Sequence, residues 1–125
     1  MDQHPPGRRV LVVEDDSDIR SMIVALLQDD GFEARSVASG REALALAESW
    51  RPDVIVLDLV LSENEAWRVS PEQRRLASVG VPIVLISAAI PRVLAAAAAD
   101  LGAAATLRKP FDAEALLDLI RGLVD

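Results

Sequence analysis

The sequence contains no cysteine and no tyrosine, and it has a single histidine, His4, and a single lysine, Lys109. Without cysteine the chain cannot form a disulfide framework, a cysteine-zinc site or a thiol nucleophile. His4 lies in a proline-rich stretch, so histidine catalysis is not expected. No apolar run approaches the roughly 18 residues of a membrane span, and residues 1–7 lack the apolar segment of a signal peptide. We therefore expect a soluble, cytoplasmic protein.

Positive charge is also scarce. The chain carries 13 lysine and arginine residues against 20 acidic residues, which gives a net charge of −7. Nucleic acids and anionic membranes would repel such a chain, so neither is an expected partner. The length of 125 residues and the 51% hydrophobic content indicate one folded domain with an ordinary core. We predict a flexible tail at 1–7 and a single domain at 8–125, with no output domain after it.

Three short runs of β-branched and aliphatic residues, at 10–13, 54–57 and 83–86, show no alternation with polar residues. This pattern is typical of parallel strands that are covered on both faces. Two weaker strands are expected at 32–37 and 104–107, where small and polar residues dilute the pattern as they do in edge strands.

Apolar residues recur at helical spacing in four further segments, at 19–27, 43–50, 91–101 and 112–123. A weaker helix at 65–77 contains Pro71, so this helix is either kinked or begins late. Alternating strands and helices of this kind predict an α/β fold with a five-stranded parallel sheet. Its strand order is expected to be 2-1-3-4-5, with helices on both faces.

Polar residues follow four of the predicted strands. In an open parallel sheet, ligands bind beyond the carboxyl ends of the strands, where the strand order reverses. In order along the chain, the residues at these ends are Glu14, Asp15 and Asp16, then Asp58, then Ser87, then Lys109. Asp15 and Asp58 should face each other, because they follow neighbouring strands.

Carboxylates held close together stay ionised only when a cation joins them, and their oxygens suit Mg²⁺, or Mn²⁺ in its place. Lys109 can neutralise a further anion such as a phosphoryl group, and Ser87 can donate a hydrogen bond to the same group. Each residue alone has an ordinary explanation, such as a helix cap for Asp16 or a surface charge for Lys109. Their convergence predicts phosphoryl transfer to an aspartate.

The segments 10–16, 53–59, 82–88 and 107–111 resemble, in order and spacing, the receiver domain of two-component response regulators. The resemblance supports the strand order and implies a flavodoxin-like, three-layer (βα)5 sandwich. It implies that Asp58 accepts a phosphoryl group from a sensor histidine kinase or a phosphotransfer protein.

The resemblance also implies the metal ligands. Asp15 and Asp58 would bind Mg²⁺ directly, together with the backbone carbonyl of Val60, and Glu14 would act through a metal-bound water.

Two further roles follow from the same resemblance. Ser87 and Lys109 would contact the phosphoryl oxygens, and the Lys109–Pro110 bond is expected to be cis.

Thr106 departs from the family. Many receivers have an aromatic residue at this position, which turns inward when the residue equivalent to Ser87 moves toward the phosphoryl group. We therefore question the usual coupling from Ser87 through Thr106 to the output face.

A second departure lies after the acceptor. Ser62 and Ala66 stand where the family usually has proline and glycine. Alanine in the left-handed conformation open to that glycine would cost about 1–2 kcal/mol. We therefore predict a remodelled loop at 61–67.

We favour a single-domain response regulator that signals by conformational change or phosphoryl relay and catalyses only its own phosphorylation and dephosphorylation. Its expected output face combines 91–101, 104–107 and 112–123, in a monomer or weak homodimer. The alternative is a pseudo-receiver that binds partners without phosphorylation. An aspartyl-phosphate phosphatase is disfavoured because the best acceptor does not follow the first strand. A flavin-binding protein is disfavoured because the acidic run after that strand would repel the flavin phosphate.

Overall fold

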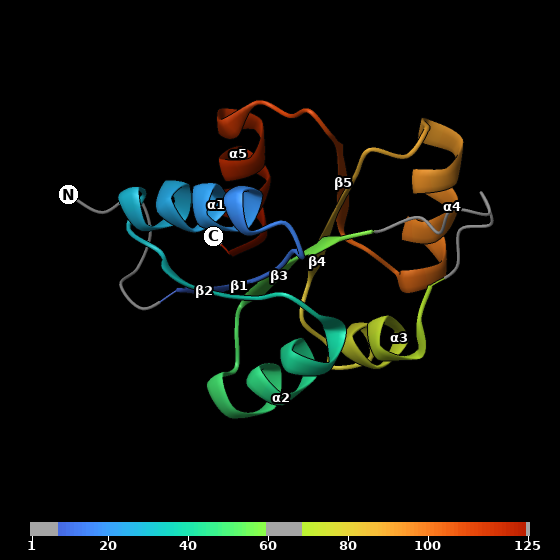
Figure 1. Ribbon diagram of the computed structural model, residues 1–125, viewed down its shortest axis with the longest axis horizontal. Coiled ribbons are helices and arrows are strands. Elements are labelled where there is room, and N and C mark those ends of the chain that lie inside the picture. Colours follow the sequence, from blue (N-terminus) through green and yellow to red (C-terminus); the bar gives the residue numbers. More distant parts are fainter. Residues whose placement is uncertain (1–7, 60–68, 125) are drawn as a thin grey trace.

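The computed structural model describes residues 8–59 and 69–124, in which strands and helices alternate along the chain (Figure 1). The strands are β1 (Arg9–Val13), β2 (Glu33–Val37), β3 (Val54–Asp58), β4 (Ile83–Ser87) and β5 (Ala105–Arg108). The helices are α1 (Ser17–Asp29), α2 (Gly40–Trp50), α3 (Pro71–Ala77), α4 (Pro91–Leu101) and α5 (Ala113–Val124).

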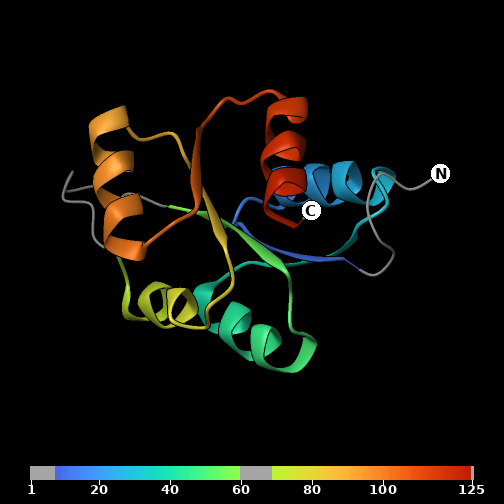
Figure 2. The same cartoon turned by 180° about the vertical axis from the view of Figure 1, so that it is seen from behind.

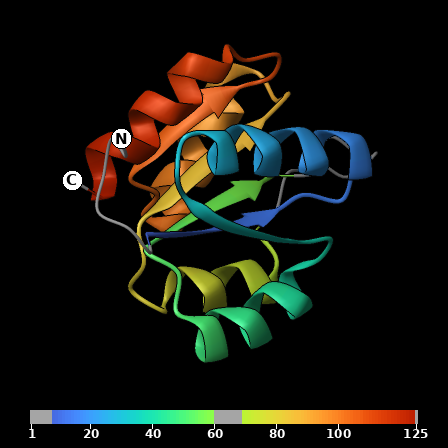
Figure 3. The same cartoon turned by 90° about the vertical axis from the view of Figure 1, so that its left-hand side faces the viewer.

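The strands form a single sheet in the order β2-β1-β3-β4-β5, and every neighbouring pair is parallel. Figure 3 shows the strand arrows running in the same direction. The predicted fold class and strand order are therefore confirmed. In this order β1 and β3 lie side by side, although α1, β2 and α2 separate them in the sequence.

Helices cover both faces of the sheet. Figures 1 and 2 show α1 and α5 on one face and α2 and α3 on the other. Side chains from β1 alternate between two core clusters. Leu11 and Val13 pack with residues of α2, α3 and α4, whereas Val10 and Val12 pack with residues of α1 and α5. Burial on both faces explains why β1, β3 and β4 show no polar alternation.

The weaker strand predictions also fit the structure. The edge strand β2 alternates between exposed and half-buried residues up to its last residue, and β5 alternates in the same way throughout. A strand at the edge has only one hydrogen-bonded neighbour and less cover, so its sequence tolerates small and polar residues.

Of the two alternatives for the helix at 65–77, the late start is the observed one. Helix α3 begins at Pro71, and Ser70 forms a capping box with Gln73. Each of these two side chains accepts a hydrogen bond from the other's backbone N–H, at 3.0 and 2.8 Å. Proline suits this first helical position because its missing N–H would have no partner within the helix.

The predicted tail at 1–7, the backbone carbonyl of Val60 and the loop at 61–67 with Ser62 and Ala66 lie outside the described residues. None of the helices in the described part of the chain combines the length and hydropathy needed to span a membrane.

Candidate functional site

The parallel topology brings four strand ends to one edge of the sheet. Glu14 and Asp15 follow β1, Asp58 is the last residue of β3, Ser87 is the last residue of β4, and Lys109 follows β5. Together with Asp16, these residues line one hollow of about 360 Å³, in which Ala88 and Ala89 of the β4–α4 loop also take part. The structure therefore brings together all the described residues that the sequence predicted for the acceptor, metal and phosphoryl contacts.

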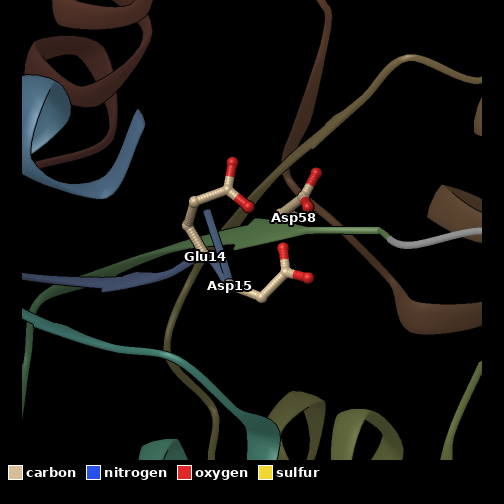
Figure 4. Close-up of side chains that lie close together, drawn as sticks. All are labelled: Glu14, Asp15 and Asp58. Atoms are coloured by element: carbon tan, nitrogen blue, oxygen red, sulfur yellow. The ribbon is translucent and has the colours of Figure 1, made fainter. Parts of the chain in front are cut away.

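The carboxylates of Glu14, Asp15 and Asp58 form a cluster. One oxygen from each lies within 4.8 Å of the others. Figure 4 shows the three carboxylates converging on a common space. Glu14 and Asp58 are buried, with relative exposures of 1% and 8%, whereas Asp15 is exposed at the rim. Three hard oxygen donors with one open side suit a divalent cation such as Mg²⁺.

Lys109 supplies positive charge at this cluster. Its Nζ lies 2.7 Å from Oε1 of Glu14 and 3.1 Å from Oδ1 of Asp58. The lysine side chain is largely buried, with 20% of its surface exposed. One ammonium group pairs with two members of a cluster of three carboxylates, so the cluster retains a negative excess that favours binding of a cation.

This environment shifts the pKa values of the two buried carboxyl groups in opposite directions. Burial, together with the neighbouring Glu14 carboxylate, raises the pKa of Asp58 to about 7, although Lys109 opposes the shift. Burial alone would also raise the pKa of Glu14, but its hydrogen bonds with Asp58 and Lys109 outweigh burial and the pKa is lowered. In the absence of a cation, Asp58 is therefore the group that holds a proton near neutrality.

The pKa of Lys109 responds to the same neighbours. Burial favours the neutral amine, but hydrogen bonds and charge interactions with Glu14 and Asp58 outweigh it and raise the pKa. The lysine therefore stays charged throughout the physiological pH range. The peptide bond between Lys109 and Pro110 is cis, as expected.

The hydroxyl group of Ser87 is buried, with 1% of the residue exposed. Its Oγ donates to the carbonyl oxygen of Leu59 at 3.1 Å and accepts from the backbone N–H of Ala89 at 3.0 Å. The hydroxyl therefore joins the end of β3 to the loop that follows β4.

Asp16 and Thr106 are not part of the carboxylate cluster, although Asp16 lies at the edge of the hollow. Asp16 is the N-cap of α1, where its carboxylate accepts hydrogen bonds from the N–H groups of Asp18 and Ile19. This is the cap role considered for it from the sequence. Thr106 is an exposed residue of β5 whose strand partner is Leu85, and it does not line the hollow.

Sequence reasoning missed Arg20. Its Nη1 donates to the carbonyl oxygens of Glu14 at 2.8 Å and Asp15 at 3.4 Å. The arginine thus holds the backbone from which both carboxylates extend. An arginine one turn into the helix after the acidic run was the available signal, but helical spacing alone does not show that its side chain turns back to the loop.

Comparison with known proteins gives a family match. A family model described as "Response regulator receiver domain" matches residues 10–121. The transcriptional regulatory protein PdtaR of Mycobacterium tuberculosis is 35% identical over 116 residues, which cover 90% of this chain and 55% of that protein. The DNA-binding response regulator MtrA of the same organism is 32% identical over 114 residues, or 91% of this chain and 49% of MtrA. The chain thus spans about half the length of these curated relatives.

Solved structures agree with this match. A response regulator receiver protein from Burkholderia phymatum has a TM-score of 0.79 and 32% identity, over 96% of this chain and 95% of that one. The chemotaxis protein CheY4 of Vibrio cholerae has a TM-score of 0.80 and 29% identity, over 94% of this chain and 98% of that one.

Proposed function

This chain belongs to the family of response regulator receiver domains, and on that basis we propose that residues 8–125 form a phosphorylation-controlled switch with Asp58 as its phosphoacceptor. The phosphoryl donor would be the phosphohistidine of a sensor kinase or of a phosphotransfer protein. The observation that carries the proposal is the position of the Asp58 carboxylate, which is buried in the hollow 3.1 Å from Nζ of Lys109.

The proposed reaction transfers one phosphoryl group. An oxygen of Asp58 forms a bond to phosphorus as the bond from phosphorus to the donor nitrogen breaks, and the donor imidazole leaves with its electron pair. Lys109 supplies positive charge beside the reacting carboxylate, and Ser87 supplies a hydroxyl donor to a phosphoryl oxygen. These are contributions of position and charge rather than of covalent chemistry.

The carboxylate cluster fits Mg²⁺, with Mn²⁺ as a substitute. Asp15 and Asp58 would hold the ion together with the backbone carbonyl of Val60, and Glu14 would contact it through a water. When bound, the ion supplies positive charge that lets closely spaced carboxylates remain ionised together.

We propose a regulator rather than an enzyme that turns over a separate substrate, and we propose the cytoplasm as its location. Its output would pass to a protein target through the face formed by α4, β5 and α5, in a monomer or weak homodimer. The phosphorylation-independent alternative lacks comparable support, because the chain keeps the acidic residues, Ser87 and Lys109 together in one site.

Intact mass after incubation with acetyl phosphate and Mg²⁺ tests the proposal. We expect a single phosphoryl adduct that does not form when Mg²⁺ is chelated before acetyl phosphate is added. Asp58→Asn should abolish the adduct. Asp16→Asn is the matched control and should retain it, because asparagine caps helices about as well as aspartate. Absence of an adduct on the wild-type protein, under conditions that load another receiver, would contradict the proposal.

A further inference from the structure

Arg108 of β5 makes a contact that the proposed phosphoryl chemistry leaves unexplained. The residue is exposed and lies directly opposite Ser87 in the ladder between β4 and β5. Its Nε donates a hydrogen bond to the carbonyl oxygen of Ala89 at 3.0 Å. The guanidinium group therefore reaches across the edge of the sheet to the loop that leads into α4.

Ala89 is held from two sides. The residue is 3% exposed, and its backbone N–H donates to Oγ of Ser87 at 3.0 Å. Its carbonyl oxygen accepts from Arg108. The two backbone groups flank the same Cα atom, so Ser87 from inside and Arg108 from the surface together determine the position of the loop.

The hydroxyl of Ser87 cannot serve a phosphoryl group without changing these contacts. A serine hydroxyl has a single hydrogen to donate, and Ser87 donates it to the carbonyl of Leu59 at 3.1 Å. Donation to a phosphoryl oxygen on Asp58 requires that this hydrogen leave the carbonyl of Leu59. Where Oγ turns toward the phosphoryl group, the N–H of Ala89 either follows it or loses its acceptor. A loop that follows Oγ carries the carbonyl of Ala89 away from its present position beside Arg108.

We propose that Arg108 is a positioning residue for Ser87. Through its hydrogen bond to the carbonyl of Ala89, Arg108 holds the β4–α4 loop in its unphosphorylated arrangement, and this bond is released when Ser87 turns to the phosphoryl group. The inference rests on the proposed function and specifies how that site is regulated. It supplies a route from Ser87 to an exposed side chain of β5 that does not depend on Thr106.

The proposal has a thermodynamic consequence with a definite sign. If the bond between Arg108 and Ala89 forms only in the unphosphorylated arrangement, its removal destabilises that arrangement and favours binding of a phosphoryl mimic. Loss of a positive charge near the site has the opposite effect, because an anion then binds more weakly. The sign of the change therefore separates a positioning role from a purely electrostatic one.

Beryllofluoride, a mimic of the phosphoryl group on aspartate, is the probe. Its affinity for the full chain is measured by titration with Mg²⁺ present. Arg108→Met removes the donors and keeps an aliphatic stem, and Arg92→Met makes the same change at an exposed arginine in the first turn of α4. We expect Arg108→Met to bind beryllofluoride about three- to tenfold more tightly, the range set by loss of one hydrogen bond. Arg92→Met should bind no more tightly than the wild type.

A second variant tests the route. In Ser87→Ala no hydroxyl links the site to Ala89, so adding Arg108→Met should leave the affinity unchanged within twofold. In the wild type, the Nε–H resonance of Arg108 should shift when beryllofluoride binds and stay in place with Mg²⁺ alone.

Unchanged or weaker beryllofluoride binding by Arg108→Met would overturn the positioning role, as would an equal effect in the Ser87→Ala background. Failure of the wild-type protein to bind beryllofluoride would instead count against the proposed function.

Discussion

At the residue scale, the site is a balance between burial and charge at Asp58. The carboxyl group lies among Glu14, Asp15 and Lys109, and its raised pKa means that one of the acidic groups stays protonated near neutrality without a cation. The Asp58 residue is 8% exposed and lines the hollow in which the proposed phosphoryl transfer would take place. If Asp58 is the acceptor, as proposed, a cation bound to the cluster would do more than neutralise charge, because it would also favour the ionised form of Asp58 that acts as the nucleophile.

This balance predicts a pH-dependent stability in metal-free buffer. The pKa of Asp58 is about 7 in the folded protein, against an ordinary value of 3.8. Between these values the folded chain binds more protons at Asp58 than the unfolded chain does. The contribution of this group to the free energy of unfolding is therefore fully present below the ordinary pKa and is lost as pH rises through the folded pKa. Chelator-treated wild type should therefore become less stable from about pH 4.5 to 7.5, as measured by urea unfolding.

Asp58→Asn should remove most of this dependence. At pH 8 the variant should unfold with a free energy about 1–2 kcal/mol larger than that of the wild type, because no charge is forced into the cluster. Saturating Mg²⁺ should remove the pH dependence of the wild type, whereas it should change the pH dependence of Asp58→Asn little. A wild-type protein whose stability rose over the same pH interval would show that another group dominates.

At the element scale, short local signals decide where the helices begin and end. Helix α4 starts with Pro91 and ends at Leu101, and its C-cap Gly102 has a φ of 66°, the left-handed conformation open to glycine. Gly122 is different, because it lies inside α5. A Cβ atom added at either glycine would meet no atom within 4 Å other than its chain neighbours and, at Gly122, the backbone of its own helix. The two positions therefore differ in backbone conformation and not in packing space.

Replacing these two glycines should change stability in opposite directions. Gly102→Ala should lower the free energy of unfolding by about 1–2 kcal/mol, because alanine is strained in the left-handed conformation. Gly122→Ala should raise it by about 0.5–1 kcal/mol, because alanine favours the helix more than glycine does. Thermal unfolding of both variants beside the wild type is the measurement. A shift of the same sign in both would show that backbone conformation is not the deciding factor.

At the scale of the whole molecule, one sheet carries two cores. Leu11 lies in the cluster on the side of α2, α3 and α4, and Leu116 lies in the cluster on the side of α1 and α5. Both side chains are fully buried. Because both clusters include side chains of β1, β3 and β4, neither can be lost while the sheet stays intact.

The shared sheet predicts cooperative unfolding. Leu11→Ala and Leu116→Ala should each lower the free energy of unfolding by about 2–5 kcal/mol, the usual range for emptying a buried leucine site. The half-buried Leu44 of α2 is the matched control, and Leu44→Ala should lower the free energy of unfolding by less than either of these variants. Circular dichroism and tryptophan fluorescence should report one coincident urea transition in every variant. Two separated transitions would mean that the cores unfold independently.

Much of the fold was predictable because its signals are local. Continuous apolar runs predicted the central strands, and weaker runs predicted the edge strands. The expected order of the strands was enough to place Glu14, Asp58 and Lys109 at one edge of the sheet. The helical pattern runs through Pro71 and allows either a kinked helix or a late start, and the capping box of Ser70 with Gln73 selects the late start.

The sequence by itself determined the elements, their order and the residue types at the strand ends, since periodicity and caps depend on neighbouring residues. Only the tertiary structure decided that Lys109 contacts Glu14, 95 residues away, as well as Asp58, and that Arg20 turns back to the loop before it. It also decided that Arg108 holds the carbonyl of Ala89. Such contacts depend on side-chain rotamers and on packing between distant segments, and no local pattern in the chain encodes them.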